Sequence, residues 1–178
     1  MPKIITARRL EGESEQAREY VRTHIVLPSS VLGLVFMVAG MAALVYQFVY
    51  ISYEWRTFVE SVGLLLIGMF FGWAQTRYHQ YLLREFPGNL ASRLRLFTQN
   101  RAKRPRKEIK IAPIEHPRRN LVPLGYALGA VALFIAAAWS SMFGQTYYVA
   151  AFLLPWVGFF WAKVYCWRGV LVDVKSKK

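Results

Sequence analysis

The chain has 178 residues, of which 55% are hydrophobic and 19% are charged, and its formal net charge is +13. Soluble domains average roughly 45–50% apolar and about 25% charged residues. The apolar residues of this chain are concentrated in four long segments, which is not typical of a soluble domain. An ordinary soluble domain is therefore excluded, and the single cysteine, Cys166, excludes an internal disulfide or a cysteine metal site.

The first 27 residues precede the first apolar block and are predicted to be helical. Over 6–26, Leu10, Ala17, Val21 and Ile25 recur on one face, which is typical of an amphipathic helix on the inner membrane surface or against a partner. An alternative is that this helix simply extends the first membrane span into solvent. The segment lacks the short apolar core and cleavage site of a signal peptide.

Two apolar segments, near 28–51 and 57–77, predict a first transmembrane hairpin over 28–77. A bilayer core of about 30 Å needs roughly 20 helical residues, and helices satisfy their backbone groups locally in lipid. Glu60, one turn from Arg56, is the carboxylate of the second segment. Because acids inside membranes are candidates for function, three roles are open for Glu60: a structural pair with Arg56, pairing with another subunit, and an ion or proton role.

A polar, basic inner-side loop is predicted over 78–120. The second helix should continue to Phe86 and break at Pro87-Gly88, and Asn89 should cap a short interfacial helix. Three later prolines predict extended chain that a partner would order. Basic residues of this loop are candidates for contact with anionic phospholipids or an acidic partner: Arg101, Lys103, Arg104, Arg106, Lys107, Arg118 and Arg119. The lack of aromatic residues between Thr98 and Leu121 argues against sequence-specific nucleic-acid binding.

A second transmembrane hairpin is predicted over 121–168, with spans near 121–142 and 147–167, followed by a basic tail over 169–178. Small residues recur at helical spacing in these spans. In lipid, helix association depends on close backbone contact, so such residues predict helix–helix interfaces, either within the bundle or with another subunit. The predicted helix-packing residues are Gly68, Gly72, Gly125, Gly129, Ala132 and Ala136, and Ser140 continues their face.

Basic residues are sorted to one side of this arrangement. Five precede the first span, Arg56 alone lies between spans one and two, twelve lie from Arg77 to Arg119, none separates spans three and four, and five follow from Lys163 onward. The positive-inside rule then places both termini and the 78–120 loop on the cytoplasmic side of a bacterial inner membrane or the matrix side of a mitochondrial one. The predicted fold is an all-α integral membrane protein of four transmembrane helices, arranged as two N-in/C-in hairpins.

Residue types for catalysis are scarce. The three histidines, His24, His79 and His116, fall at or beyond the predicted inner surface, where they cannot hold a haem between helices. Asp173 is the only aspartate, and neither a phosphate-binding GxxxxGK loop nor an HExxH pair is present. We therefore expect no enzymatic activity, no metal and no cofactor.

The sequence thus favours a non-catalytic accessory subunit that stabilises a multi-subunit membrane complex of the energy-transducing kind, respiratory or photosynthetic. Its expected partners are other membrane protein subunits and anionic phospholipids. Two alternatives belong to other functional classes. One is a membrane adaptor or membrane-shaping protein whose basic loop binds anionic lipid or RNA, and the other is a small proton-coupled transporter centred on Glu60.

Overall fold

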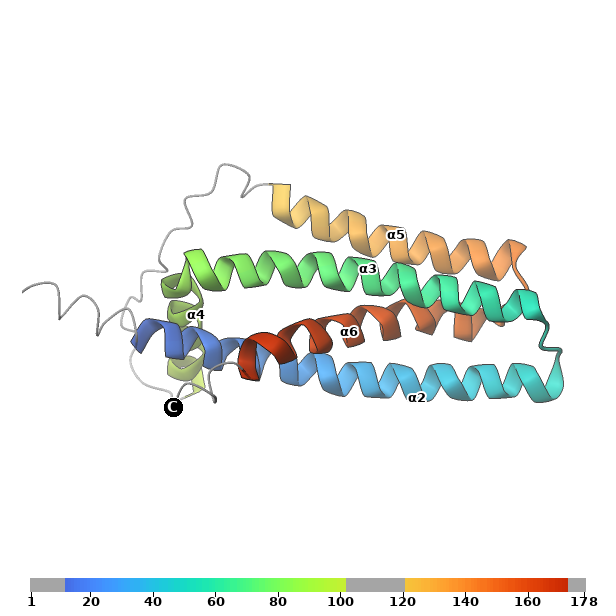
Figure 1. The fold of residues 1–178 in the computed structure, drawn as a ribbon, viewed down its shortest axis with the longest axis horizontal. Coiled ribbons are helices and arrows are strands. Elements are labelled where there is room, and N and C mark those ends of the chain that lie inside the picture. The colour runs from blue at the N-terminus through green and yellow to red at the C-terminus, as the bar shows by residue number, and fades with distance from the viewer. Residues whose placement is uncertain (1–11, 102–120, 173–178) are drawn as a thin grey trace, which may run out of the picture. The chain divides into compact units, whose positions relative to one another are not determined.

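A computed structural model of the chain describes residues 12–101 and 121–172, which are helical except at short connections (Figure 1). The elements in chain order are η1 (Val21–Val26), α2 (Leu27–Tyr50), α3 (Trp55–Glu85), α4 (Pro87–Arg101), α5 (Leu121–Phe143) and α6 (Tyr148–Val172). Residues 12–20 are also helical and continue without a break into η1 and α2.

Four helices are long and apolar enough to cross a membrane: Gly12–Tyr50, Trp55–Glu85, Val122–Phe143 and Tyr148–Arg168. The prediction of an all-helical chain with four such helices is confirmed for the described residues. Each helix contains nearly all of one segment chosen from the sequence, because a long apolar run in lipid can satisfy its backbone only as a helix. The last helix extends past the predicted end near 167 to Val172.

The described part of the N-terminal segment forms one continuous helix with the first span, and residues 6–11 lie outside the described range. Six residues before Leu27 form a π-helical segment, in which the N–H of Leu27 donates to the carbonyl oxygen of Arg22. Pro28 follows directly. Proline offers no N–H to the carbonyl four residues earlier and its ring crowds that carbonyl, and we attribute the wider π turn to this misfit.

The described residues fall into two compact units. One, the flanking unit, comprises 12–27 and 77–101, and the other, the transmembrane unit, comprises 28–76 and 121–172. In the flanking unit the buried apolar side chains are Ala17, Val21, Leu82, Leu90 and Ala91.

Within the flanking unit, α3 ends at Glu85 and the break lies at Phe86, one residue before the break predicted at Pro87-Gly88. Helix α4 begins at Pro87 and not after Asn89. The expectation that Asn89 caps this helix is therefore wrong. Proline suits the first helical position, because the N–H that it lacks would have had no partner there. Asn89 lies within the first turn, where its N–H donates to the carbonyl oxygen of Phe86 at 3.2 Å.

In the transmembrane unit, α2, α3, α5 and α6 run alongside one another (Figure 1). Helix α6 contacts each of the other three: α2 at Gly33 and Gly40, α3 at Gly68 and Gly72, and α5 at Phe134. Where three of the helices meet lies a small apolar core of Ala43 from α2, Leu64 from α3, and Ala150, Ala151 and Leu154 from α6. Both short connections, 51–54 and 144–147, lie at the same end of this unit (Figure 1).

Candidate functional site

Glycines bring α3 and α6 into backbone contact. A Cβ at Gly68 would overlap the carbonyl oxygen of Pro155, and one at Gly72 would overlap that of Phe159. Gly158 of α6 makes the reciprocal contact, because a Cβ there would overlap the carbonyl oxygen of Leu65. Helices that pack in lipid use small residues for such close approach, so these three positions explain how α3 and α6 hold together.

The small residues of α5 divide into two groups. A Cβ at Gly129 would lie 3.3 Å from Cδ1 of Phe71 on α3, and Ala136 packs against the apolar core. Ala132 and Ala136 also line a groove between α3 and α5. Gly125 differs from these residues, since a Cβ there would meet no atom of the described chain within 4 Å. Gly129 and Ala136 therefore pack against other helices of the bundle, Ala132 lines the groove, and Gly125 lies on the surface.

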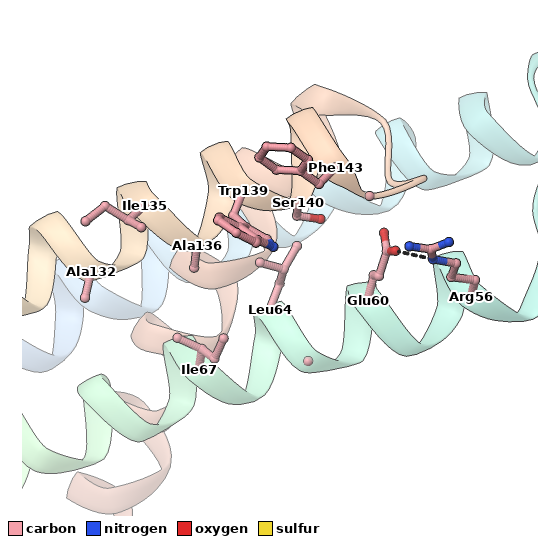
Figure 2. A pocket seen from close by; sticks show the side chains of 12 residues that line it. Arg56, Glu60, Leu64, Ile67, Ala132, Ile135, Ala136, Trp139, Ser140 and Phe143 are labelled. Atoms are coloured by element: carbon pink, nitrogen blue, oxygen red, sulfur yellow. Dashed lines mark hydrogen bonds and ion pairs between the residues drawn. The ribbon is translucent and has the colours of Figure 1, made fainter.

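Glu60 binds the connection between α5 and α6. Its Oε2 accepts hydrogen bonds from the N–H of Gln145 at 2.8 Å, the N–H of Thr146 at 3.3 Å and the hydroxyl of Thr146 at 3.1 Å. Its Oε1 accepts from the Nε of Arg56 at 3.2 Å (Figure 2). A carboxylate suits this position, because every group that it meets there is a donor.

Gln47, on α2, also binds the connection between α5 and α6. Its side chain is 1% exposed; its Nε2 donates to the carbonyl oxygen of Gln145 at 2.6 Å, and its Oε1 accepts from the N–H of Tyr147 at 2.8 Å. Gln47 is not among the site residues predicted from the sequence. The available signal was that Gln47 is the only carboxamide in the apolar segment 28–51, and a buried amide must find partners.

Together, Gln47 and Glu60 form what we term the turn clamp. They bind backbone groups at the start of α6, where the first N–H groups of a helix have no partner within the helix. A negative carboxylate is also favoured near a helix N-terminus by the helix dipole. Because the clamp residues come from α2 and α3, the clamp fastens the first pair of helices to the second pair at one end of the transmembrane unit.

An open groove of about 640 Å³ lies between α3 and α5. Its walls are mostly apolar, with Leu64 and Ile67 on α3 and Ala132, Ile135 and Ala136 on α5, while Arg56, Glu60 and Ser140 lie toward one end (Figure 2). Ser140 is 8% exposed, and within the described chain its hydroxyl has no hydrogen-bond partner. The groove thus combines a long apolar floor with a polar end.

The described residues do not bring together the side chains of a metal site. No group of three or more histidine, cysteine, aspartate or glutamate side chains is placed there to hold a metal ion. His24 stacks on Tyr20 at a centroid distance of 5.0 Å, and His79 packs against Tyr78. Of the predicted lipid or partner contacts, Arg101 ends α4, and Lys103, Arg104, Arg106, Lys107, Arg118 and Arg119 lie outside the described residues.

No known protein family matches the chain, and no curated protein or solved structure is detectably similar to it.

Proposed function

We propose that this chain is a non-catalytic accessory subunit that stabilises a multi-subunit membrane complex of the energy-transducing kind, respiratory or photosynthetic. The observation that carries the proposal is the exposure of the first half of α5. Residues 123–128 are all exposed, and six consecutive positions of a helix cover every side of it. This half of α5 therefore packs less against the rest of the transmembrane unit than its second half does.

The surface of this half-helix has the composition of a helix-packing face. Gly125 lies between the large exposed side chains Leu124 and Leu128, and a Cβ at Gly125 would meet open space. In lipid, a small residue flanked by larger ones lets another backbone approach closely, and packing of this kind drives helix association there. The proposal assigns this surface, centred on Gly125, to a helix of a neighbouring subunit.

The proposal includes the orientation of the chain. With both short connections at one end of the transmembrane unit, Pro28, Thr76 and Leu121 share the opposite end. The two hairpins 28–77 and 121–168 would then be inserted with both termini and the basic 78–120 segment inside, in a bacterial or mitochondrial inner membrane. The inner basic residues would contact anionic headgroups, at about 1 kcal/mol per residue close to the surface, and neighbouring subunits.

Purification from native membranes in a mild detergent tests this function. We expect the wild-type chain to migrate with a larger assembly of several different polypeptides, which mass analysis would identify. A Gly125→Leu variant should remain folded but should no longer migrate with that assembly, because the added side chain fills the space that a neighbouring helix would occupy. Ala138→Leu, at an exposed position on the same helix, is the matched control and should stay in the assembly. A wild-type chain that migrates alone or only with copies of itself would refute the proposal.

A further inference from the structure

We propose that the groove between α3 and α5 binds one acyl chain of a glycerophospholipid and that Arg56 binds the phosphate of the same molecule. The groove is shaped by side chains within the transmembrane unit alone. The inference requires that the four helices span a bilayer, and it does not depend on the accessory-subunit function. A lipid so held would be an integral part of the bundle surface, distinct from any lipid at the basic inner segment.

The size and lining of the groove suit a hydrocarbon chain. Its volume of about 640 Å³ lies within the roughly 300–1,000 Å³ typical of small-molecule sites. Leu64 and Ile67 form one wall, and Ala132 and Ala136 form the other, so the floor offers apolar contact without a charged group. Gly63 widens the groove between Glu60 and Ile67, since a Cβ there would meet nothing within 4 Å in the described chain.

The length of the groove matches one leaflet of a membrane. From Arg56 to Ile67 the α3 helix advances eleven residues, and at about 1.5 Å per residue this distance is about 16 Å. Half of a hydrocarbon core of about 30 Å is about 15 Å. A transmembrane helix of a partner would need a groove along the whole core, about twice as long. The dimensions therefore favour a single acyl chain over a partner helix.

The polar end of the groove provides groups for a phospholipid headgroup. The Arg56 side chain is 65% exposed, and its Nε is the guanidinium donor bound to Glu60. A guanidinium has five N–H donors, so its outer face can bind a phosphate through charge-assisted hydrogen bonds. Arg56 lies at the end of α3 where a headgroup would sit, and the apolar walls extend away from it (Figure 2).

Ser140 supplies the second polar contact. Ser140 lines the groove, and its hydroxyl is buried and has no partner in the part of the chain that the structure describes. Leaving a buried hydroxyl unpaired costs about 1–3 kcal/mol, so such a group points to a missing partner. In a glycerophospholipid the ester carbonyls lie between the phosphate and the acyl chains. An ester carbonyl would accept the Ser140 hydrogen bond while the phosphate binds Arg56.

Native mass spectrometry of the full chain in mild detergent, titrated with phosphatidylethanolamine, measures this binding directly. We expect one tightly retained lipid per wild-type chain. Gly63→Leu should reduce its affinity by roughly tenfold or more, because the new side chain fills the groove. Ala138→Leu, at an exposed position of α5 that does not line the groove, is the control and should bind as the wild type does. Equal binding by Gly63→Leu and the wild type would overturn the assignment.

Two further variants test the headgroup contacts. Arg56→Gln should weaken phosphatidylethanolamine binding about fivefold, which corresponds to the loss of about 1 kcal/mol. Diacylglycerol of the same chain length has no phosphate, so its affinity should not change in Arg56→Gln. Ser140→Ala should weaken both ligands, since both have ester carbonyls. If wild-type chain prefers neither ligand, or if Arg56→Gln weakens both equally, the phosphate contact is refuted.

A photoreactive amino acid at Ile67 identifies the occupant in native membranes. Ile67 lines the groove and is exposed, so the probe would be directed into the bound molecule. An adduct with the mass of a phospholipid is expected. An adduct with a polypeptide would overturn the proposal in favour of a partner helix. Migration of the Gly63→Leu variant with the larger assembly is a separate readout, so failure of the lipid site and failure of the proposed function are distinguishable.

Discussion

At the scale of single residues, polar side chains in this bundle are matched to backbone groups that lack helical partners. The carboxylate of Glu60 only accepts hydrogen bonds, and it meets N–H and hydroxyl donors. The carboxamide of Gln47 both donates and accepts, and it meets one carbonyl and one N–H. In lipid no water replaces a lost partner, so such pairs should determine where the connection between α5 and α6 lies. The bonding of Glu60 supports a structural role for this residue.

Replacing Gln47 by leucine should destabilise the bundle by about 1–3 kcal/mol, because the carbonyl of Gln145 and the N–H of Tyr147 would lose their partners. Gln145→Leu is the matched control. Its exposed side chain changes in the same way, but the backbone groups that bind Gln47 and Glu60 remain. Thermal unfolding in detergent micelles compares the two variants. Equal stability of Gln47→Leu and Gln145→Leu would show that the clamp contributes nothing.

The pairing of Arg56 with Glu60 could be read from the sequence, but the bonds from Gln47 and Glu60 to the connection between α5 and α6 could not. Arg56 and Glu60 are one helical turn apart, so their pairing follows from local geometry. The bonds from Gln47 to the connection join residues 98 and 100 positions apart. Such bonds depend on how α2, α3 and α6 pack, and periodicity within one segment carries no information about that.

At the scale of the helices, apolar length predicted the elements well, and the errors occur where local chemistry competes. The spans near 28–51, 57–77 and 121–142 each fall close to a helix of the structure. The sequence-based prediction starts α4 after Asn89, a residue typical of helix caps. The helix in fact begins at Pro87, because proline can itself occupy the first helical position. The small residues of α5 were predicted as one face, yet Gly125 is separated from the others by lying in the exposed half of the helix.

Glycine substitutions in α3 should have opposite effects on stability depending on position. Gly68→Ala should destabilise the unit by about 1–3 kcal/mol or more, because its Cβ would overlap the backbone of Pro155 and push α6 away. Gly63→Ala, five residues earlier in the same helix, should leave stability unchanged or raise it by up to about 1 kcal/mol, as alanine favours a helix over glycine. Resistance to unfolding in detergent is the measurement. A Gly68→Ala variant as stable as Gly63→Ala would refute the close contact.

At the scale of the whole molecule, α6 connects the parts of the transmembrane unit. It contacts α2 and α3 at glycines, it contacts α5 at Phe134, and the residues that precede its first turn are held by the turn clamp. This arrangement leaves α5 with one face in the bundle and its first half exposed. The exposed first half of α5 is the observation on which the proposed function rests.

The central claim is that the four helices span the membrane with both short connections on one side, because the lipid site and the docking surface both require that the helices lie in a bilayer. In a variant with Cys166 replaced by alanine, single cysteines at Ser52, Gln145 and Arg93 would be treated with an impermeant maleimide from outside intact cells or organelles. All three positions are exposed in the structure. We predict that positions 52 and 145 react from outside and that position 93 reacts only after the membrane is opened. Labelling of position 93 in sealed membranes, or different accessibility of positions 52 and 145, would contradict the account.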